Sequence, residues 1–213
     1  MSNLRIRDLL HLSRIPRWTN TDVDRAQTVA EHSYNVCALS LEIAQALNRV
    51  SAFSVSTLAV LQWAIVHDGP ESYTGDMPSP FKVALGGDFM AKFEIAACPW
   101  YEVEVPTDPK VATVVAIADT MEAVIYGRRH VMEPDKVKYC RDRLFKQVEQ
   151  AVARFGWASL RDVVFGILDN ITPTSDPTPN LDHSLDQACQ NQQLGTSGKA
   201  RSIHSPERRS PDR

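Results

Sequence analysis

The chain has 213 residues, of which 43% are hydrophobic, and a formal net charge of −3. A chain of this length can bury one sizeable core, so we expect a single main domain. The acidic balance gives no long-range attraction for nucleic acid or anionic membranes, and we expect neither as a partner. No apolar run approaches the roughly 18 residues that a membrane-spanning helix needs.

The cysteines are scattered along the chain without any C-x-x-C spacing. They are Cys37, Cys98, Cys140 and Cys189. This distribution argues against a disulfide framework and against a zinc site made of thiolates. We therefore expect a reducing, cytoplasmic location.

Apolar residues recur at helical spacing along most of the chain, which predicts an all-α bundle. The first helix is predicted over 4–13, ending before Pro16. The second is predicted over 28–48, where Thr28 and Glu31 can form a capping box. This second helix carries an apolar stripe that we expect to face the core: Val29, Val36, Leu39, Ile43 and Leu47.

A third helix is predicted over 56–67, with Leu58, Leu61 and Ile65 facing inward. We expect it to stop at Gly69-Pro70, because proline disfavours the helical conformation in the residue before it. Further helices are predicted at about 80–85, 88–98, 109–127, 134–155 and 159–170.

The C-terminal segment is rich in Pro, Ser, Asp and Gln and shows almost no apolar periodicity. Such a segment cannot bury enough surface to offset the entropy of ordering it. We therefore expect a folded domain over residues 1–172, followed by a disordered tail over residues 173–213.

An unusual set of polar residues accompanies the predicted helices. His67 and Asp68 close the apolar third helix, His32 lies in the first turns of the second, and Asp119 interrupts the apolar run VVAIADTMEAV. Taken singly, His32 could be a packed histidine and Asp119 an ion-pair partner. Together they offer two imidazoles and two carboxylates, a set suited to a divalent transition metal such as Zn²⁺, Co²⁺, Mn²⁺ or Fe²⁺.

This H…HD…D pattern resembles the HD superfamily of metal-dependent phosphohydrolases. Further stretches look like its 5'-deoxynucleotidase branch and the related phage dATP triphosphohydrolases. They are R-W at Arg17-Trp18, A-E-H-S at 30–33, H-D-x-x-E at 67–71 and T-G-D-x-P-x-P-x-K at 74–82. The resemblance implies an HD-domain helical bundle. It also implies one metal per chain, because binuclear members need further histidines between Asp68 and Asp119 and this chain has none there.

The resemblance also assigns roles to particular residues. His32, His67, Asp68 and Asp119 would hold the metal. Glu71 and Asp68 would be catalytic, with Glu71 handling the proton of the attacking water or of the leaving oxygen. Substrate contacts would come from Arg17, Trp18, Asp76, Met77, Pro78, Ser79 and Lys82. The residues alone leave simpler alternatives open: a solvated loop carboxylate for Glu71, a solvated helix cation for Lys82 and a packing role for Trp18.

The implied partner is a deoxynucleotide, hydrolysed at the bond to its 5' oxygen. The first expectation is dATP, giving deoxyadenosine and triphosphate. The alternatives are a 5'-deoxynucleotidase acting on monophosphates and a catalytically silent nucleotide-binding HD domain. A homo-oligomer stays open, and a phage-encoded protein would work in the host cytoplasm.

Overall fold

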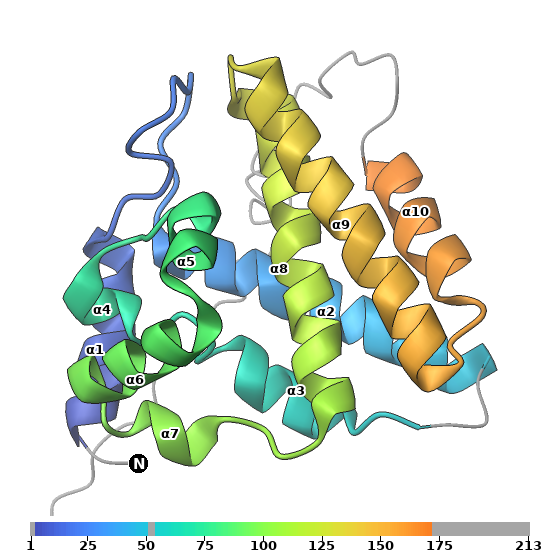
Figure 1. Cartoon of the computed structure of the whole chain (residues 1–213), viewed down its shortest axis with the longest axis horizontal. Coiled ribbons are helices and arrows are strands. Elements are labelled where there is room, and N and C mark those ends of the chain that lie inside the picture. Colours follow the sequence, from blue (N-terminus) through green and yellow to red (C-terminus); the bar gives the residue numbers. More distant parts are fainter. Residues whose placement is uncertain (1–2, 51–53, 172–213) are drawn as a thin grey trace, which may run out of the picture. The chain divides into compact units, whose positions relative to one another are not determined.

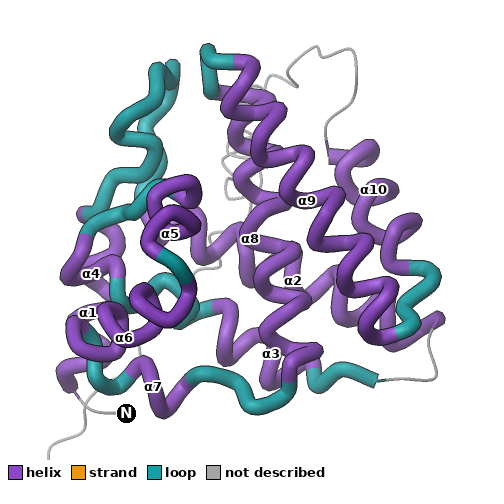
Figure 2. Tube along the Cα trace, in the orientation of Figure 1, coloured by secondary structure: helices purple, strands orange, loops and turns teal. Residues whose placement is uncertain are grey.

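A computed structural model describes residues 3–50 and 54–171, with side chains from residue 5 onward. These residues form helices and connecting loops, with no strand among them (Figure 2). The all-α prediction is thus confirmed for the described part of the chain. Both residues 51–53 and the predicted tail over 173–213 lie outside it.

The N-terminal helix α1 (Asn3–His11) continues into a short 3-10 turn (Leu12–Arg14). A loop then leads to the long helix α2 (Val29–Val50), whose start was predicted from a capping box. The Thr28 hydroxyl accepts a hydrogen bond from the backbone N–H of Glu31 at 3.2 Å, as that motif requires. The Glu31 carboxylate, however, forms an ion pair with the Arg25 guanidinium in the loop that precedes the helix.

Three long helices surround the core with α2. Helices α8 (Pro109–His130) and α9 (Pro134–Phe155) run antiparallel and side by side, while α2 passes behind them and α10 (Leu160–Ile171) packs against α9 (Figure 1). The predicted stripe of α2 is confirmed, since all five of its residues are buried. Contacts of His32 and Asn35 with Asp119 and Glu122 show that the N-terminal half of α2 lies beside the middle of α8.

The prediction for the third helix was wrong in two respects. Helix α3 (Thr57–Ala64) ends earlier than expected, and a run of hydrogen-bonded turns carries the chain on to Pro70. Its buried residues are Val60 and Ala64, whereas Leu58 and Ile65 are 67% and 55% exposed. Because α3 is apolar around most of its circumference, spacing could not determine which face packs against α2 and α8.

Four shorter helices form a second group on the other side of α8 (Figure 1). They are α4 (Glu71–Thr74), α5 (Ser79–Leu85), α6 (Gly87–Ala97) and α7 (Tyr101–Glu104). The sequence did not predict α4 or α7, each of which is a single turn. No helix in the described residues is long and apolar enough to cross a membrane.

The turns after α3 are fixed from two sides. The Tyr101 hydroxyl donates to the backbone carbonyl of His67 at 2.8 Å, and Trp100 donates to the Asp8 carboxylate at 3.0 Å. A Cβ added to Gly69 would lie 2.4 Å from Cη2 of Trp100, so only glycine leaves room for this indole. Helices α1 and α7 thereby hold the His67-Asp68 segment in place.

Candidate metal centre and substrate pocket

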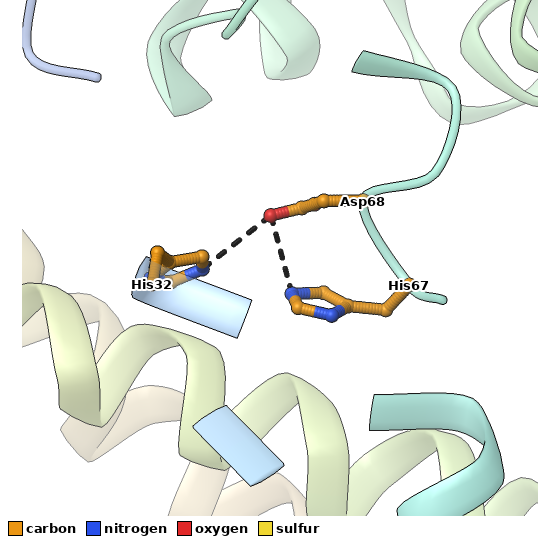
Figure 3. A group of neighbouring side chains, drawn as sticks. All are labelled: His32, His67 and Asp68. Carbon is orange, nitrogen blue, oxygen red and sulfur yellow. Dashed lines mark ion pairs between the residues drawn. The ribbon is translucent and has the colours of Figure 1, made fainter. Parts of the chain in front are cut away.

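Three side chains of the kind that can hold a metal ion meet where α2 approaches the turns after α3 (Figure 3). Oδ2 of Asp68 lies 3.4 Å from Nε2 of His32 and 3.2 Å from Nε2 of His67. One nitrogen from each ring and one carboxylate oxygen all lie within 4.8 Å of one another. These are residues that the sequence placed in one site, and the structure brings them together.

The contacts of the Nδ1 atoms of His32 and His67 leave the Nε2 atoms of both rings available to bind a metal. Nδ1 of His32 lies 2.6 Å from the Glu122 carboxylate, and Nδ1 of His67 lies 2.7 Å from the backbone carbonyl of Ala64. A carbonyl oxygen can only accept, so the Nδ1 of His67 carries its hydrogen. Both Nε2 atoms are buried without a hydrogen-bond partner, and each faces Asp68. This is how proteins orient imidazoles that bind a metal through Nε2.

Asp119, from the middle of α8, approaches the same point from the side of His32. Its Oδ1 lies 3.2 Å from Nε2 of His32, and its side chain is 27% exposed. It lies outside the tight group of three, on the side that opens toward solvent. An aspartate there can close a ligand set while leaving positions for water and substrate.

The electrostatics of the group fit a cation. Burial and the Arg17 charge lower the pKa of His32, but nearby carboxylates outweigh both and hold it well above its usual value. Although burial opposes it, the nearby imidazoles of His67 and His32 hold the pKa of Asp68 well below its ordinary range. Both shifts arise because imidazole nitrogens and carboxylates face one another in this group. A divalent cation would satisfy both Nε2 atoms and offset the charge of the carboxylates.

Glu71 begins α4, three residues after Asp68, and is 3% exposed. This position overturns the solvated-loop alternative. Its Oε1 accepts from Nζ of Lys82 at 2.8 Å, so Lys82 is a paired cation, while Oε2 is buried without a hydrogen-bond partner. Burial and the Asp68 charge raise the pKa of Glu71 to about 7, although Lys82 opposes the shift. A carboxylate with this pKa can accept and return a proton near neutral pH.

Arg17 and Trp18 sit at the start of the loop before α2. The Arg17 guanidinium lies 3.5 Å from Asp76 and 3.3 Å from Glu122. Trp18 has φ 61°, an unfavourable conformation for a tryptophan. Its backbone N–H donates to the Asp76 carboxylate at 3.3 Å, and its ring stacks on Tyr126 at 5.7 Å. Asp76 therefore holds both residues toward the space beside the metal-ligand group.

That space is a pocket of about 280 Å³. Its wall includes Asp119 together with most of the predicted substrate residues, while Lys82 belongs to the Glu71 side of the site. The lining residues come from four segments: Arg17, Trp18, Asn20 and Thr21; Asp76, Met77, Pro78, Ser79 and Pro80; Asp119, Thr120 and Ala123; and Asp135, Lys136, Tyr139, Cys140 and Arg143.

Sequence reasoning missed a buried polar network centred on Glu122, which is 2% exposed. Besides His32 and Arg17, its carboxylate accepts from Gln27 at 2.6 Å and from Asn35 at 3.1 Å. One signal was available, because Glu122 follows Asp119 by three residues in an apolar run and so lies on the same helix face. The wall contributed by α9 had no such signal, since it depends on how α9 packs against α8.

Replacing Glu122 with glutamine should weaken metal binding by about 10–100-fold, the usual cost of losing a group that orients a metal ligand. The reason is that His32 would lose the charge that orients and polarises its ring. Competition with a fluorescent chelator would measure the affinity. Glu149→Gln is the matched control, because Glu149 lies on α9 away from the site and pairs with Arg161. Equal affinity in the Glu122 variant and the control would contradict the proposed role.

Comparisons with known proteins agree with this picture. Residues 6–87 match the 5'-deoxynucleotidase YfbR-like family. Over 137 residues, 61% of this chain and 69% of the relative, the chain is 29% identical to a dATP triphosphohydrolase of Salmonella phage PMBT28. It is 37% identical over 75 residues to a 5'-deoxynucleotidase of Pectobacterium atrosepticum, covering 34% of this chain and 38% of the relative.

Solved structures share the fold. A Cyanophage S-2L HD phosphohydrolase, bound to dA and one catalytic Zn²⁺ ion, aligns with a TM-score of 0.59 at 23% identity, over 78% of this chain and 95% of that one. An HD-domain phosphohydrolase of Listeria innocua aligns with a TM-score of 0.60 at 15% identity, over 91% and 98%. The chain thus resembles 5'-deoxynucleotidases and dATP triphosphohydrolases in sequence, and it shares the fold of HD phosphohydrolases.

Proposed function

We propose that this protein hydrolyses a 2'-deoxynucleoside 5'-phosphate at the bond to the 5' oxygen, with dATP as the first candidate substrate and deoxyadenosine and triphosphate as products. One observation carries the proposal: the two unpartnered Nε2 atoms and Asp68 lie beside Asp119, which also lines the pocket. The dATP triphosphohydrolases among the relatives support the choice of substrate.

His32, His67, Asp68 and Asp119 would hold one divalent ion. Two imidazoles and two carboxylates suit Zn²⁺, Co²⁺, Mn²⁺ or Fe²⁺, and the Zn²⁺ of the Cyanophage S-2L enzyme makes zinc the first candidate. When bound, such an ion supplies positive charge that polarises the phosphate and makes water more acidic.

The remaining steps belong to the side chains around the ligand group. Glu71 is the proposed proton acceptor for the attacking water, because its pKa of about 7 lets it take a proton and later deliver it to the 5' oxygen. Lys82 holds the Glu71 carboxylate in one orientation through Oε1, which leaves Oε2 for the proton. The bond that breaks joins phosphorus to the 5' oxygen, and water supplies the new oxygen on phosphorus.

Arg17 is the proposed phosphate ligand, since a guanidinium fork binds two phosphate oxygens at once. Asp76 and Glu122 hold it from behind, and this leaves the fork little freedom. Trp18 and the segment from Asp76 to Ser79 would enclose the sugar. A close aromatic face and a carboxylate leave little room for a 2'-hydroxyl, which would exclude ribonucleotides.

The second candidate is a 5'-deoxynucleotidase that releases phosphate from monophosphates. The match over residues 6–87 favours it, since this segment contains every site residue predicted from the sequence except Asp119. Both candidates use the same chemistry at the same bond and differ in the number of phosphates that the site accepts.

Product analysis tests the proposal. Protein loaded with Zn²⁺, Co²⁺ or Mn²⁺ would be incubated with deoxynucleoside and ribonucleoside mono-, di- and triphosphates, and the products separated by ion-exchange chromatography. We expect dATP to yield deoxyadenosine and intact triphosphate, with ATP at least about tenfold slower, the factor that 1.4 kcal/mol produces. Release of pyrophosphate as the main product, or equal rates for ATP and dATP, would overturn the assigned bond and pocket.

A further inference from the structure

The pocket contains three cationic side chains, and two of them are neutralised. Arg17 lies between Asp76 and Glu122, and Lys136 lies 3.1 Å from Glu133. Lys82, which is not part of the pocket wall, pairs with Glu71. Arg143 differs, because no carboxylate in the described part of the chain lies within ion-pair distance of its guanidinium, whereas NH1 donates to the Ser79 hydroxyl at 2.6 Å.

The packing of α9 against α8 puts Arg143 at the end of the pocket where Asp119 lies. Val137 packs against Gly127, where an added Cβ would lie 3.2 Å from the valine side chain. The two helices are antiparallel, so moving forward along α9 corresponds to moving backward along α8. The residues six positions after Val137 and six positions before Gly127 therefore lie side by side, about 9 Å from the Val137–Gly127 contact. These residues are Arg143 and Met121, and Asp119 is only two positions from Met121.

A positive charge without a counter-ion in a pocket wall favours an anionic ligand over a neutral one. The nucleobase and the sugar are neutral, and Arg17 already serves the phosphate next to the sugar in the proposed function. The groups left for Arg143 are the phosphates beyond that one. The Ser79 hydroxyl occupies a single N–H of the guanidinium, so the remaining donors can bind phosphate oxygens.

We propose that Arg143, oriented by Ser79, binds the terminal phosphates of a nucleoside triphosphate and thereby selects triphosphates over monophosphates. This inference rests on the proposed function, since it assigns the substrate class of the same site. A monophosphate would bind without using Arg143. A triphosphate would gain charge-assisted hydrogen bonds there, each stronger than a neutral one.

The test compares kcat/KM for dATP and dAMP in four metal-loaded proteins: the unmodified enzyme, Arg143→Gln, Arg143→Lys and Arg141→Gln. Arg141 is the matched control, because it is exposed on the same helix and faces only its neighbour Asp142 at 3.8 Å. We expect Arg143→Gln to lower kcat/KM for dATP by about tenfold or more, and that for dAMP by less than about threefold. Arg143→Lys should recover part of the loss, because it keeps the charge but not the fork.

A binding measurement separates this proposal from the reaction itself. Inorganic triphosphate should raise the melting temperature of the unmodified protein, and Arg143→Gln should lose most of that rise while keeping the rise produced by orthophosphate. This result would support Arg143 even if no nucleotide is hydrolysed, in which case the proposed function alone fails. Equal losses for dATP and dAMP, a change in base preference, or an unchanged response to triphosphate would each overturn the assignment.

Discussion

Replacing Asp68 with alanine should lower turnover by at least about 10³-fold, since a metal supplies several kcal/mol to this kind of reaction. Asp68 is the side chain that faces both orphaned Nε2 atoms, at 3.4 and 3.2 Å, so its loss removes one ligand and the charge that keeps the other two together. His67→Ala should have a similar effect. Product release and the metal content of the purified variants, measured by atomic absorption, are the two readouts.

The matched control is Asp142→Ala, which removes an exposed aspartate of α9 that pairs with Lys138. Circular dichroism would show that both variants keep their helices. The apolar core cluster contains none of the proposed ligands, so we expect it to persist in both variants. Full activity of Asp68→Ala in protein shown to contain no metal would refute the proposed centre.

Much of the fold could be predicted from the chain, and the reason is visible in α2. Its buried residues repeat with the period of a helix, and polar residues separate them, so one face alone could pack. Helix α3 lacks that contrast: Leu58 and Ile65 are as apolar as the buried Val60 and Ala64. Which face is buried there depends on neighbours from distant parts of the chain.

The candidate site likewise contains residues that could be predicted from the sequence and residues that could not. The proximity of His32, His67 and Asp68 could be predicted because histidines and aspartates in apolar helices are conspicuous, and because their order resembles a known pattern. A solvated loop carboxylate was left open as the simpler alternative for Glu71, but the turn of α4, which was not predicted, buries it beside Lys82. Arg143 could not be predicted as a pocket residue, because in the sequence it is one of several charged residues on an amphipathic helix. Only the packing of α9 against α8 places it in the pocket wall.

Replacing Glu71 with glutamine should lower kcat by about 10²–10⁴-fold, the usual contribution of a positioned acid or base, while metal content stays unchanged. Glutamine keeps the shape of the side chain but cannot take a proton. In the unmodified enzyme the acidic side of the pH-rate profile should report deprotonation of Glu71, and the variant should lose that limb. Glu102→Gln, an exposed change on α7, is the control. Retained activity with an unaltered profile would refute a proton-transfer role.

Stability gives a second readout of Glu71 that does not depend on turnover. Burial raises its pKa from 4.5 to about 7, so the folded state binds the proton more tightly than the unfolded state. The resulting stabilisation is complete below pH 4.5 and is lost as the pH rises through about 7. In chelator-treated protein, the unfolding free energy relative to Glu71→Gln should therefore fall by roughly 2 kcal/mol between about pH 5 and 8. Both proteins carry His32 and His67, so their own titration largely cancels in this difference. A difference that does not change with pH, measured by urea unfolding, would show that Glu71 is ionised throughout this range and is unsuited to exchange a proton near neutral pH.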